Sequence, residues 1–339
     1  MDVLIIGGTG LISRAITRFL VARGHAVTIY NRGQRQAQIP EEVNRLYGDR
    51  TEYKTFEAKM RRAGPFDCVI DMVCFEPADA ESACRAFRGR TKQYIFCSTV
   101  DVYTKPAACY PITEDERREP SPSFPYAHKK ARCERIFARA HERGAFAVTT
   151  IRPAHTYGPG GRILHTLGFE TYFLDRIRRG KPIVVHGDGS SLWSSCHRDD
   201  VARAFVQAVG NEDTFGRAYH VTGEEWMTWN RYHRGMAQAM DAPEPTLVHI
   251  PTDLLTKALP QKAMWCAENF RFNNIFDNSA AREDLAFSYT IPWLEGVRSA
   301  VAWLEEHDEI ERSETYPFYD RLIAAWRRLG EGMARHVRA

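Results

Sequence analysis

The chain has 339 residues, of which 44% are hydrophobic and 26% charged, as in ordinary folded proteins and unlike disordered or fibrous ones. This length allows two domains, and the formal net charge of +3 is too small to indicate a nucleic-acid or membrane partner. The eight cysteines lie at least six positions apart, which excludes CxxC-type metal spacing and favours a reducing compartment. Neither a secretory leader nor an apolar run of about 18 residues is present, so we expect a cytoplasmic protein without a metal site.

Short apolar runs alternate with helical patterns along the first half of the chain. The first run, residues 3–6, ends in a glycine turn, and Ile12, Ile16 and Leu20 then recur at helical spacing until Gly24. Further strands are predicted at residues 26–30, 43–47, 68–71, 93–97 and 147–151. Because the strands are apolar on both faces and helices separate them, we expect an α/β fold, a Rossmann-type doubly wound parallel sheet.

The pattern changes after Arg152, where prolines and glycines at residues 153–161 break the chain. Strands are still predicted at residues 183–185 and 218–221, six of the seven tryptophans follow residue 220, and the arginine-rich segment after Arg312 predicts a solvent-exposed helix. We therefore expect a smaller, partly discontinuous C-terminal lobe that binds the substrate. The predicted division is a Rossmann domain at 1–157 with a returning piece near 191–222, and a substrate lobe at 158–190 and 223–339.

Gly7 and Gly10 stand between the first strand and the first helix, where dinucleotide-binding folds have their glycine turn. Glycine lets the backbone approach a pyrophosphate without a Cβ clash, and the N–H groups at the helix start, near Leu11 and Ile12, attract its negative charge. The sequence therefore predicts a nicotinamide dinucleotide site at this turn. A glycine-rich connection without a ligand is the alternative.

The end of the second strand, at Asn31 and Arg32, bears on which nicotinamide cofactor binds. An acidic residue here would hydrogen-bond the 2′-hydroxyl of NAD, whereas an arginine accommodates the 2′-phosphate of NADP. No carboxylate is present, and Arg32 with Arg35 favours NADP without excluding NAD; a solvated surface arginine is the alternative. Asp49, after the third strand, is either an acceptor for the adenine amino group or a plain turn aspartate.

Tyr126 and Lys130 are four residues apart, which places them on one face of a helix. The ammonium of Lys130 would favour the tyrosinate and lower the phenol pKa from its reference value of about 10. Such a phenol can accept a proton from a substrate alcohol while a hydride leaves for the nicotinamide. On spacing alone, an ordinary surface helix is the stronger interpretation.

Five blocks occur in one order along about 200 residues: Gly7-Gly8-Thr9-Gly10-Leu11-Ile12, Cys97-Ser98-Thr99-Val100-Asp101-Val102-Tyr103, Tyr126-x-x-x-Lys130, Arg152-Pro153-x-x-x-Tyr157-Gly158-Pro159 and His197-Arg198-Asp199-Asp200-Val201-Ala202. Together they resemble the extended short-chain dehydrogenase/reductases, specifically the NAD-dependent epimerase/dehydratase family acting on nucleotide sugars. The resemblance implies that Tyr126 is the catalytic base, that Thr99 hydrogen-bonds the substrate alcohol, and that Lys130 also holds the nicotinamide ribose. NAD is then the implied cofactor.

Asp101 is informative because family members that remove water or carbon dioxide from the oxidised sugar tend to carry an acid at this position. Its carboxylate would remove the acidified α-proton of a ketone intermediate, and a loop or helix-capping aspartate is the alternative. Dehydratases often place an aspartate directly after the threonine, and that position is Val100 here. Elimination would then need another acid, such as a water or Cys74. The segment Asp71-Met72-Val73-Cys74-Phe75 follows the fourth strand and is expected to border the nicotinamide, with Cys74 as a substrate contact; a buried structural cysteine is the alternative.

Three positions depart from the family pattern. Ser13 replaces the third glycine of the turn and is small enough to be tolerated there. His155 and Trp193 replace an asparagine and an arginine that contact the substrate diphosphate in many members. Because an indole offers a single N–H, we expect a less anionic substrate, with Trp193 stacking on a sugar face and His155 as a substrate contact or second acid/base. Core packing of Trp193 and a structural role for His155 are the alternatives.

The sequence therefore predicts an NAD(P)-dependent epimerase/dehydratase-type enzyme that oxidises a secondary alcohol of a sugar or nucleotide sugar, epimerises or dehydrates the ketone, and returns the hydride. An NADPH-dependent ketoreductase of the same fold is a second interpretation, which Arg32 suits. A non-catalytic dinucleotide-sensing or RNA-binding protein is a third, and the complete set of Thr99, Tyr126 and Lys130 argues against it. By resemblance we also expect a homodimer that pairs helices near 80–87 and 126–140.

Overall fold

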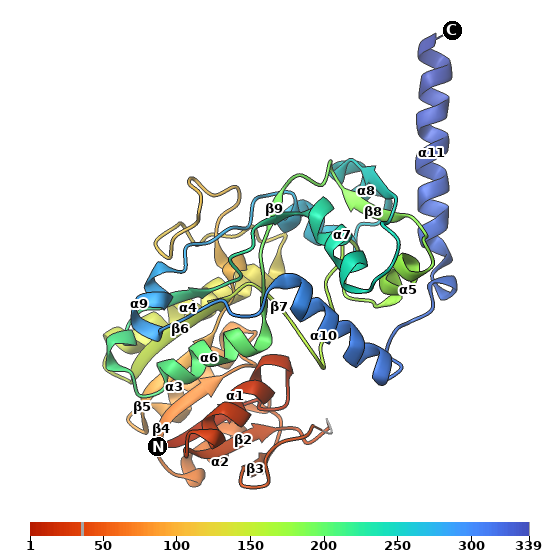
Figure 1. The fold of residues 1–339 in the computed structure, drawn as a ribbon. Helices are drawn as coiled ribbons and strands as arrows, with labels where there is room; N and C mark the ends of the chain where they lie inside the picture. The colour runs from red at the N-terminus through yellow and green to blue at the C-terminus, as the bar shows by residue number, and fades with distance from the viewer. Residues whose placement is uncertain (35–36, 339) are drawn as a thin grey trace. The chain divides into compact units, whose positions relative to one another are not determined.

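The computed structural model describes residues 1–34 and 37–338, and its chain divides into two compact units (Figure 1). Unit 1 comprises Met1–Thr156, Ser194–Glu224 and Ile275–Ile291. Unit 2 comprises Tyr157–Trp193, Glu225–Asn274 and Pro292–Ala339. Both units are therefore assembled from segments that are far apart in the sequence.

A parallel sheet of seven strands forms the centre of unit 1, in the order β11-β6-β5-β4-β1-β2-β3. Its strands are β1 (Asp2–Ile6), β2 (Ala26–Asn31), β3 (Asn44–Tyr47), β4 (Phe66–Asp71), β5 (Thr91–Cys97), β6 (Ala147–Pro153) and β11 (Ala218–Val221). Each neighbouring pair runs parallel. The strand order reverses between β1 and β4, which is where doubly wound sheets open a crevice for ligands.

Helices cover both faces of this sheet because successive strand residues point to opposite sides and both sides are apolar. On one face, Val3 and Ile5 of β1 pack with residues of α1 (Leu11–Ala22) and α6 (Arg198–Ala208). On the other face, Leu4 and Ile6 pack with residues of three further helices. These helices are α2 (Tyr53–Ala63), α3 (Pro77–Phe87) and α4 (Pro125–Glu142). The predicted Rossmann-type α/β fold is confirmed.

The predicted assignment of all of residues 223–339 to the second lobe is wrong for Ile275–Ile291, which belongs to unit 1. This segment contains the helix α9 (Ser279–Leu285), which packs against β11 and α6. Asp284 on α9 accepts a hydrogen bond of 2.7 Å from Oη of Tyr219 on β11 and pairs with Arg217. Because these contacts join residues about 65 positions apart, no local pattern in the sequence indicates them.

The remaining elements of unit 1 are short. They are the 3₁₀ helices η1 (Val100–Val102) and η2 (Glu212–Thr214), and the strand β10 (Ser195–His197), which forms a two-stranded sheet with β7 (His155–Tyr157). The η1 turn follows β5 directly and carries the threonine block that the sequence analysis singled out. Because η1 lies at the carboxyl ends of the strands, Thr99 and Asp101 lie at the edge of the sheet where ligands bind in such folds.

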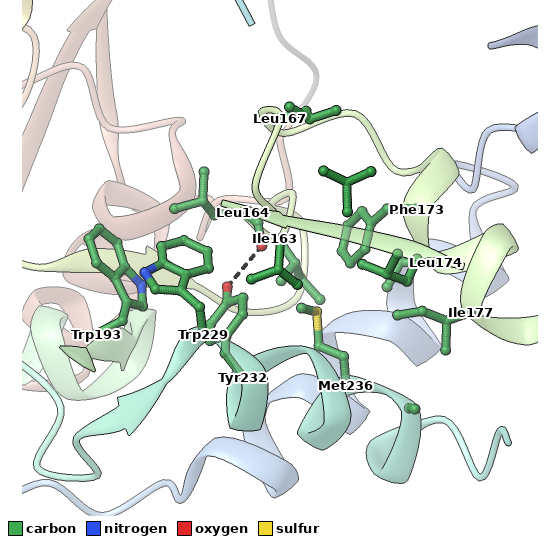
Figure 2. Packing of buried hydrophobic residues seen from close by; sticks show 14 of the residues in the cluster. Ile163, Leu164, Leu167, Phe173, Leu174, Ile177, Trp193, Trp229, Tyr232 and Met236 are labelled. Carbon is green, nitrogen blue, oxygen red and sulfur yellow. Dashed lines mark hydrogen bonds between the residues drawn. The ribbon is translucent and has the colours of Figure 1, made fainter. Parts of the chain in front are cut away.

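Unit 2 is organised around aromatic and aliphatic side chains (Figure 2). Its elements are α5 (Tyr172–Arg178), β8 (Ile183–His186), β9 (Leu192–Trp193), β12 (Met227–Thr228), α7 (Trp229–Ala239), β13 (Leu247–Ile250), α8 (Thr252–Ala258), η3 (Cys266–Phe270), α10 (Trp293–Glu306), η4 (Ser313–Thr315) and α11 (Pro317–Arg338). In the core, Oη of Tyr232 donates a hydrogen bond of 2.9 Å to the carbonyl of Leu164. Within the described ranges, none of the helices has the length and apolarity that crossing a membrane requires.

Candidate active site

The turn from β1 to α1 depends on glycine at positions 7 and 8. Gly7 and Gly8 have φ angles of +119° and +87°, which side chains rarely tolerate. A Cβ on Gly8 would lie 2.5 Å from Cγ2 of Ile29, so the turn can lie against β2 only without a side chain. A Cβ on Gly10 would meet only Oγ of Ser13, at 3.3 Å. Packing within the chain thus explains glycine at position 8, and the missing Cβ at Gly10 leaves space for a ligand.

The N-terminus of α1 offers donors for an anion. The amide N of Gly10 donates to Oγ of Ser13 at 2.9 Å, so the serine that replaces the third glycine caps the helix. The amides of Leu11 and Ile12 lie in the first turn, where N–H groups have no acceptor within the helix and the positive end of the helix dipole is found. This arrangement fits a pyrophosphate.

A cavity of about 730 Å³ lies at the carboxyl ends of the strands of unit 1. This volume is within the range of small-molecule sites, about 300–1,000 Å³. The predicted cofactor-binding residues that line it are Gly7, Gly10, Leu11, Ile12, Asn31, Arg32, Asp49 and Lys130. Tyr126, Ser98 and Thr156 also line it, the last two without having been predicted. The glycine turn and the helix that carries Tyr126 therefore line the same cavity.

Asn31 holds the glycine turn against the end of β2. Its Nδ2 donates to the carbonyl of Gly7 at 3.1 Å, and its Oδ1 accepts from the amide of Gly33 at 2.8 Å. Both polar atoms of the side chain are thus engaged within the chain. Asn31 shapes the edge of the cavity, a role that the sequence pattern does not distinguish from a direct ligand contact.

Arg32 and Asp49 line the cavity together. Oδ1 of Asp49 accepts from Oγ1 and the amide of Thr51 at 2.7 and 2.8 Å, and these bonds, assisted by the charge of Arg32, hold the pKa of Asp49 below its ordinary value. A 2′-phosphate bound by Arg32 would thus approach an ionised carboxylate, which opposes NADP. Arg35, the second arginine of the prediction, lies outside the described residues.

Lys130 is buried on α4, on the same helix as Tyr126. Its Nζ donates to the carbonyl of Cys97 at 2.7 Å and lies 4.8 and 4.9 Å from the ring centroids of Phe75 and Phe96. A carbonyl dipole and two aromatic faces therefore stabilise the ammonium at the floor of the cavity. Phe75 was not predicted as a site residue, although the segment that contains it was predicted to border the nicotinamide.

Thr99 links Tyr126 to Asp101 by hydrogen bonds. Oγ1 of Thr99 donates to Oδ2 of Asp101 at 3.1 Å and accepts from the amide of Asp101 at 3.2 Å. A hydroxyl group has one proton. That proton serves either Asp101 or the phenol of Tyr126, and the hydrogen bond with Thr99 lowers the pKa of Tyr126, as a bond donated by Thr99 does. The three side chains form a hydrogen-bonded chain between Tyr126 and the carboxylate of Asp101.

The expected lowering of the Tyr126 pKa by Lys130 is wrong for this arrangement. Burial raises the pKa of Tyr126, the charge of Asp101 and the Cys97 thiol raise it further, and the hydrogen bond with Thr99 opposes them. Lys130 is not among these influences, and its ammonium is directed at the Cys97 carbonyl. The neutral phenol is therefore the favoured form.

Lys105 is a titratable residue near Asp101 that the sequence analysis missed. Burial lowers the pKa of Lys105 to about 8, and the charge of Asp101 acts in the opposite direction. The available signal was its position four residues after Asp101, in a loop without a recognisable motif.

Cys74 lies in the apolar core between the sheet and its helices, fully buried, and does not line the cavity. Burial, with the neighbouring Cys133, raises the pKa of the Cys74 thiol. Val73 and Phe75 line the cavity instead, because successive residues of an extended segment point to opposite sides. The expectation that Cys74 borders the nicotinamide and supplies an acid is wrong.

His155 is bonded through Nδ1 to Oγ of Ser195 at 3.0 Å, and burial lowers the pKa of His155 to about 3. It is neutral at physiological pH, so the predicted second acid/base near neutral pH is wrong, and a substrate contact by His155 stays a prediction.

Trp193 belongs to the core of unit 2 and is only 4% exposed. Its ring centroid lies 5.1 Å from that of Trp229, its neighbour in Figure 2, and 5.2 Å from that of Phe270. The expectation of a sugar-stacking indole is wrong, and core packing is the correct alternative.

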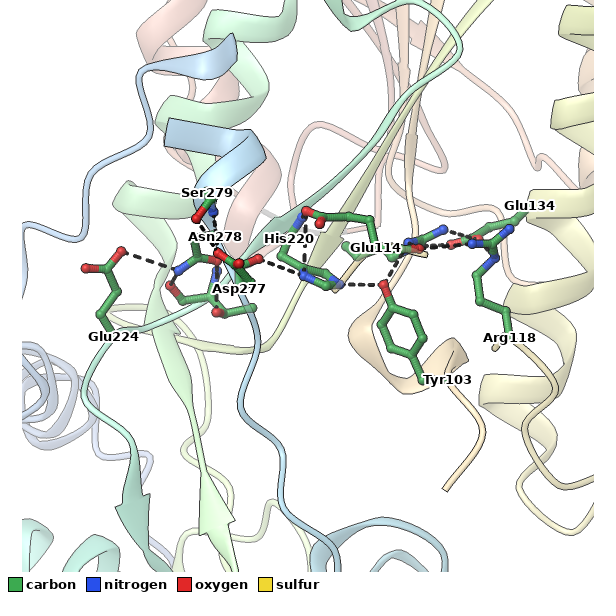
Figure 3. Close-up of polar contacts among 11 residues, drawn as sticks. Tyr103, Glu114, Arg118, Glu134, His220, Glu224, Asp277, Asn278 and Ser279 are labelled. Carbon is green, nitrogen blue, oxygen red and sulfur yellow. Dashed lines mark hydrogen bonds and ion pairs between the residues drawn. The ribbon is translucent and has the colours of Figure 1, made fainter. Parts of the chain in front are cut away.

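A buried polar network holds the segment that carries the threonine and the aspartate (Figure 3). Glu134 on α4 accepts from Nε and Nη2 of Arg152 at 2.9 and 2.8 Å and from Oγ of Ser98 at 2.5 Å. Nη1 of Arg152 donates to Oη of Tyr103 at 2.7 Å, which in turn lies 2.5 Å from Nε2 of His220. The network joins α4, β6, β11 and the η1 turn. Tyr103 and Arg152, which belong to two of the sequence blocks, thus hold the η1 turn in place.

Comparison with known proteins places the site in a family context. The model of the NAD dependent epimerase/dehydratase family matches residues 3–222. The chloroplast stem-loop binding protein of 41 kDa b from Arabidopsis thaliana is 31% identical over 261 residues, which are 73% of this chain and 65% of that protein. The chain thus spans just under two thirds of that relative. The 2′-dehydrokanamycin reductase of Streptomyces kanamyceticus is 26% identical over 277 residues, 82% of this chain and 77% of the reductase.

Solved structures share the fold. The UDP-glucose 4-epimerase of Thermotoga maritima, determined with UDP-glucose, matches with a TM-score of 0.73 and 18% identity over 91% of this chain and 100% of that chain. The UDP-glucuronic acid 4-epimerase of Bacillus cereus, in complex with NAD, matches with a TM-score of 0.71 and 18% identity over 91% of this chain and 99% of that chain. At this identity the likeness establishes the architecture alone.

Proposed function

Because the chain belongs to the NAD-dependent epimerase/dehydratase family, we propose that it oxidises a secondary alcohol of a sugar-type substrate, epimerises the ketone and returns the hydride. The observation that carries the proposal is the hydrogen-bonded chain from Tyr126 through Thr99 to Asp101, whose phenol lines the cavity of unit 1. A tyrosine connected in this way to a carboxylate suits proton transfer, and a purely ligand-binding protein has no use for it.

NAD is the cofactor of the family, and the cavity residues fit it. The amides at the start of α1 suit the pyrophosphate, and the space above Gly10 suits its close approach. Lys130, held at Nζ by the Cys97 carbonyl, presents its ammonium toward the ribose next to the nicotinamide in the arrangement that we propose. When bound, NAD supplies the acceptor for the substrate hydride.

The proton of the substrate alcohol moves along the chain of hydroxyl groups. The phenol oxygen of Tyr126 takes the alcohol proton while its own proton passes to Oγ1 of Thr99. The Thr99 proton passes to Oδ2 of Asp101, which ends as a carboxylic acid. This relay lets a neutral phenol with a raised pKa act as a base, and it runs backward when the hydride returns.

Epimerisation is favoured over elimination by two residues. The position at which dehydratases often carry an aspartate is Val100, and the thiol of Cys74 is buried in the core away from the cavity. Of the acids considered for protonation of a leaving hydroxyl, only a water then remains. Oxidation and re-reduction of one carbon need no such acid, and inversion follows when the hydride returns to the opposite face of the ketone.

The proposed substrate is a sugar that is less anionic than a nucleotide sugar. His155 and Trp193 stand at the two positions at which many family members contact a diphosphate. His155 is neutral at physiological pH, and the indole of Trp193 is buried. Neither side chain supplies the charged donors that a diphosphate prefers.

Net reduction by NADPH is the second candidate function. Its support is Arg32 at the cavity edge and the relative named 2′-dehydrokanamycin reductase, which matches 82% of the chain.

Product analysis of the purified protein separates these candidates. UDP-glucose, UDP-glucuronic acid, free glucose and 2′-dehydrokanamycin would each be incubated with oxidised and reduced cofactor, while sugar products and nicotinamide absorbance are followed. An epimerised sugar without lasting change in absorbance supports the proposal. Stoichiometric loss of NADPH supports the reductase instead. Tight binding of an RNA stem-loop, without turnover of any sugar, would overturn both.

A further inference from the structure

The helix α11 is anchored in unit 2 by its first turns. Tyr319 and Ile323 are buried in the core, and Leu322 and Trp326 are partly buried against it. The amide of Val184 donates to Oη of Tyr319 at 2.7 Å. One side of the helix is thus an apolar stripe that the core of unit 2 covers as far as Trp326.

The same stripe continues without cover. Leu329, Met333 and Val337 follow Trp326 at steps of three and four residues, which keeps them on one side of the helix. They are 55%, 66% and 77% exposed. Of the nine large hydrophobic side chains exposed among the described residues, these are the ones that share a helix face. Figure 1 shows this end of α11, beside the C label, extending past the other elements of unit 2.

The opposite side of the uncovered segment is basic. Arg327, Arg328, Arg335 and Arg338 are exposed and stand against the single acid Glu331. None of these four arginines has an ion-pair partner within residues 1–34 and 37–338. The segment therefore combines uncovered apolar side chains with uncompensated positive charge, which is the pattern of a helix that lies on a membrane surface.

A second copy of the chain fits this face poorly. A stable protein interface takes about 20–30 residues a side, whereas the uncovered stripe offers three large apolar side chains. A second α11 would also bring the same four arginines. Nucleic acid would satisfy the arginines but leave the apolar stripe in water. A bilayer with anionic headgroups satisfies both sides at once, because the apolar side chains enter the acyl boundary and the guanidinium groups meet the phosphates.

We propose that residues 324–338 of α11 bind, as an amphipathic helix lying in the plane of the surface, to membranes that carry anionic lipid headgroups. This interaction is independent of the proposed catalytic function and departs from the expectation of no membrane partner. It requires no transmembrane segment.

Vesicle sedimentation of the full chain tests the proposal. We expect the protein to sediment with phosphatidylcholine vesicles that contain phosphatidylserine, to remain in solution with phosphatidylcholine alone, and to be released by salt. The triple variant Leu329→Ser, Met333→Ser, Val337→Ser should lose binding. Replacement of Arg327, Arg328, Arg335 and Arg338 by glutamine should weaken partitioning by about a hundredfold or more.

Matched variants control for nonspecific effects. Tyr110→Ser, Phe169→Ser and Trp226→Ser remove three exposed apolar side chains elsewhere, and Arg45, Arg62, Arg88 and Arg135 replaced by glutamine remove four exposed arginines; both sets should bind as the wild type does. Because the substituted α11 residues are exposed, every variant should keep the thermal midpoint of the parent. Absence of binding by the parent chain, or equal binding by the α11 variants, overturns the proposal. So does a dimer that the triple variant converts to a monomer in the absence of lipid.

Discussion

At the scale of single residues, the chemistry of the site depends on which way the hydroxyl of Thr99 donates. In the proposed relay its proton goes to Asp101, so that the phenol of Tyr126 donates to Thr99 and the carboxylate is the final acceptor. Asp101 therefore acts in two ways. Its charge raises the pKa of Tyr126, and in the proposed relay its oxygen receives the displaced proton.

Replacement of Asp101 by asparagine should separate these two effects. Loss of the terminal acceptor should slow alcohol oxidation about a hundredfold or more. Because the charge of Asp101 raises the pKa of Tyr126, its removal lowers that pKa, and the residual rate should increase with pH as the phenolate forms. The measurement is the pH profile of kcat in the oxidation direction. Asp101→Glu, which keeps a carboxylate, should recover part of the rate, whereas an unchanged profile in Asp101→Asn would reduce Asp101 to a structural role.

Arg32, at the edge of the cavity, is the residue that we expect to contact the 2′-phosphate of NADP. Arg32→Ala should weaken NADP binding about tenfold, the value of one charged hydrogen bond, and leave NAD binding within about twofold of the parent. Calorimetric titration with both cofactors measures this, with Arg45→Ala, an exposed arginine on β3, as the matched control. Equal loss of both affinities would show that Arg32 shapes the turn instead of recognising a phosphate.

The sequence predicted correctly the residues that need a special backbone conformation and those that lie within a recognisable motif. The glycines of the turn, Tyr126 and Lys130 line one cavity, as their positions at a strand end and on one helix face indicate. Cys74 and Trp193 were misplaced because side-chain direction in an extended segment and burial in a second core depend on tertiary packing. Glu134 was missed because its partners Ser98 and Arg152 lie 36 and 18 positions away.

At the scale of elements, the strands of unit 1 were predictable because all but the exposed edge strand β3 are largely apolar, and their ends differ from expectation by at most two residues. The two-residue strands β9 and β12 of unit 2 are too short for any period to show. The exposed helix after Arg312 was predicted from its charges. Its apolar stripe went unnoticed because the arginines between the apolar residues dominate the composition.

The glycine turn gives an element-scale prediction. Gly24→Ala places a Cβ in open space at a φ of +77° and should cost about 1 kcal/mol of unfolding free energy. Gly8→Ala has a similar φ but adds a clash with Ile29, which should cost about 1–3 kcal/mol more. Urea unfolding of the two variants measures the difference. Equal midpoints would mean that the packing of the turn on β2 is not what requires glycine.

At the scale of the whole molecule, buried histidines should make the fold sensitive to acid. Burial lowers the pKa of six histidines to about 3 or 4; they are His155, His165, His186, His197, His220 and His233. In the unfolded chain these groups take up protons near pH 6.5, while in the folded chain they stay neutral until about pH 3–4. The unfolded state therefore binds more protons in this window, and stability falls as pH falls through it.

His233→Gln tests this acid sensitivity. Removing one neutral buried histidine should flatten the decrease of unfolding free energy by up to about 1.4 kcal/mol per pH unit between pH 6.5 and 4. Glutamine can keep the hydrogen bond with Thr166. His336→Gln, on the exposed end of α11, should leave the slope unchanged. Thermal midpoints across this pH range provide the measurement, and identical slopes for the two variants would contradict the burial argument.

The whole molecule combines a dinucleotide-type cavity in unit 1 with a separate aromatic core in unit 2. The predicted homodimer and the cytoplasmic location stay predictions, as does the substrate-binding role of the second unit. We propose that unit 1 performs hydride chemistry through one tyrosine, Tyr126.

Single-turnover hydride transfer by Tyr126→Phe tests that claim most directly. With a sugar alcohol that the parent oxidises and with saturating NAD, the variant should transfer hydride at least about a hundredfold more slowly, while its affinity for NAD remains within about twofold of the parent. Tyr110→Phe, at an exposed position, should behave as the parent does. Hydride transfer by Tyr126→Phe at the parental rate would contradict the account.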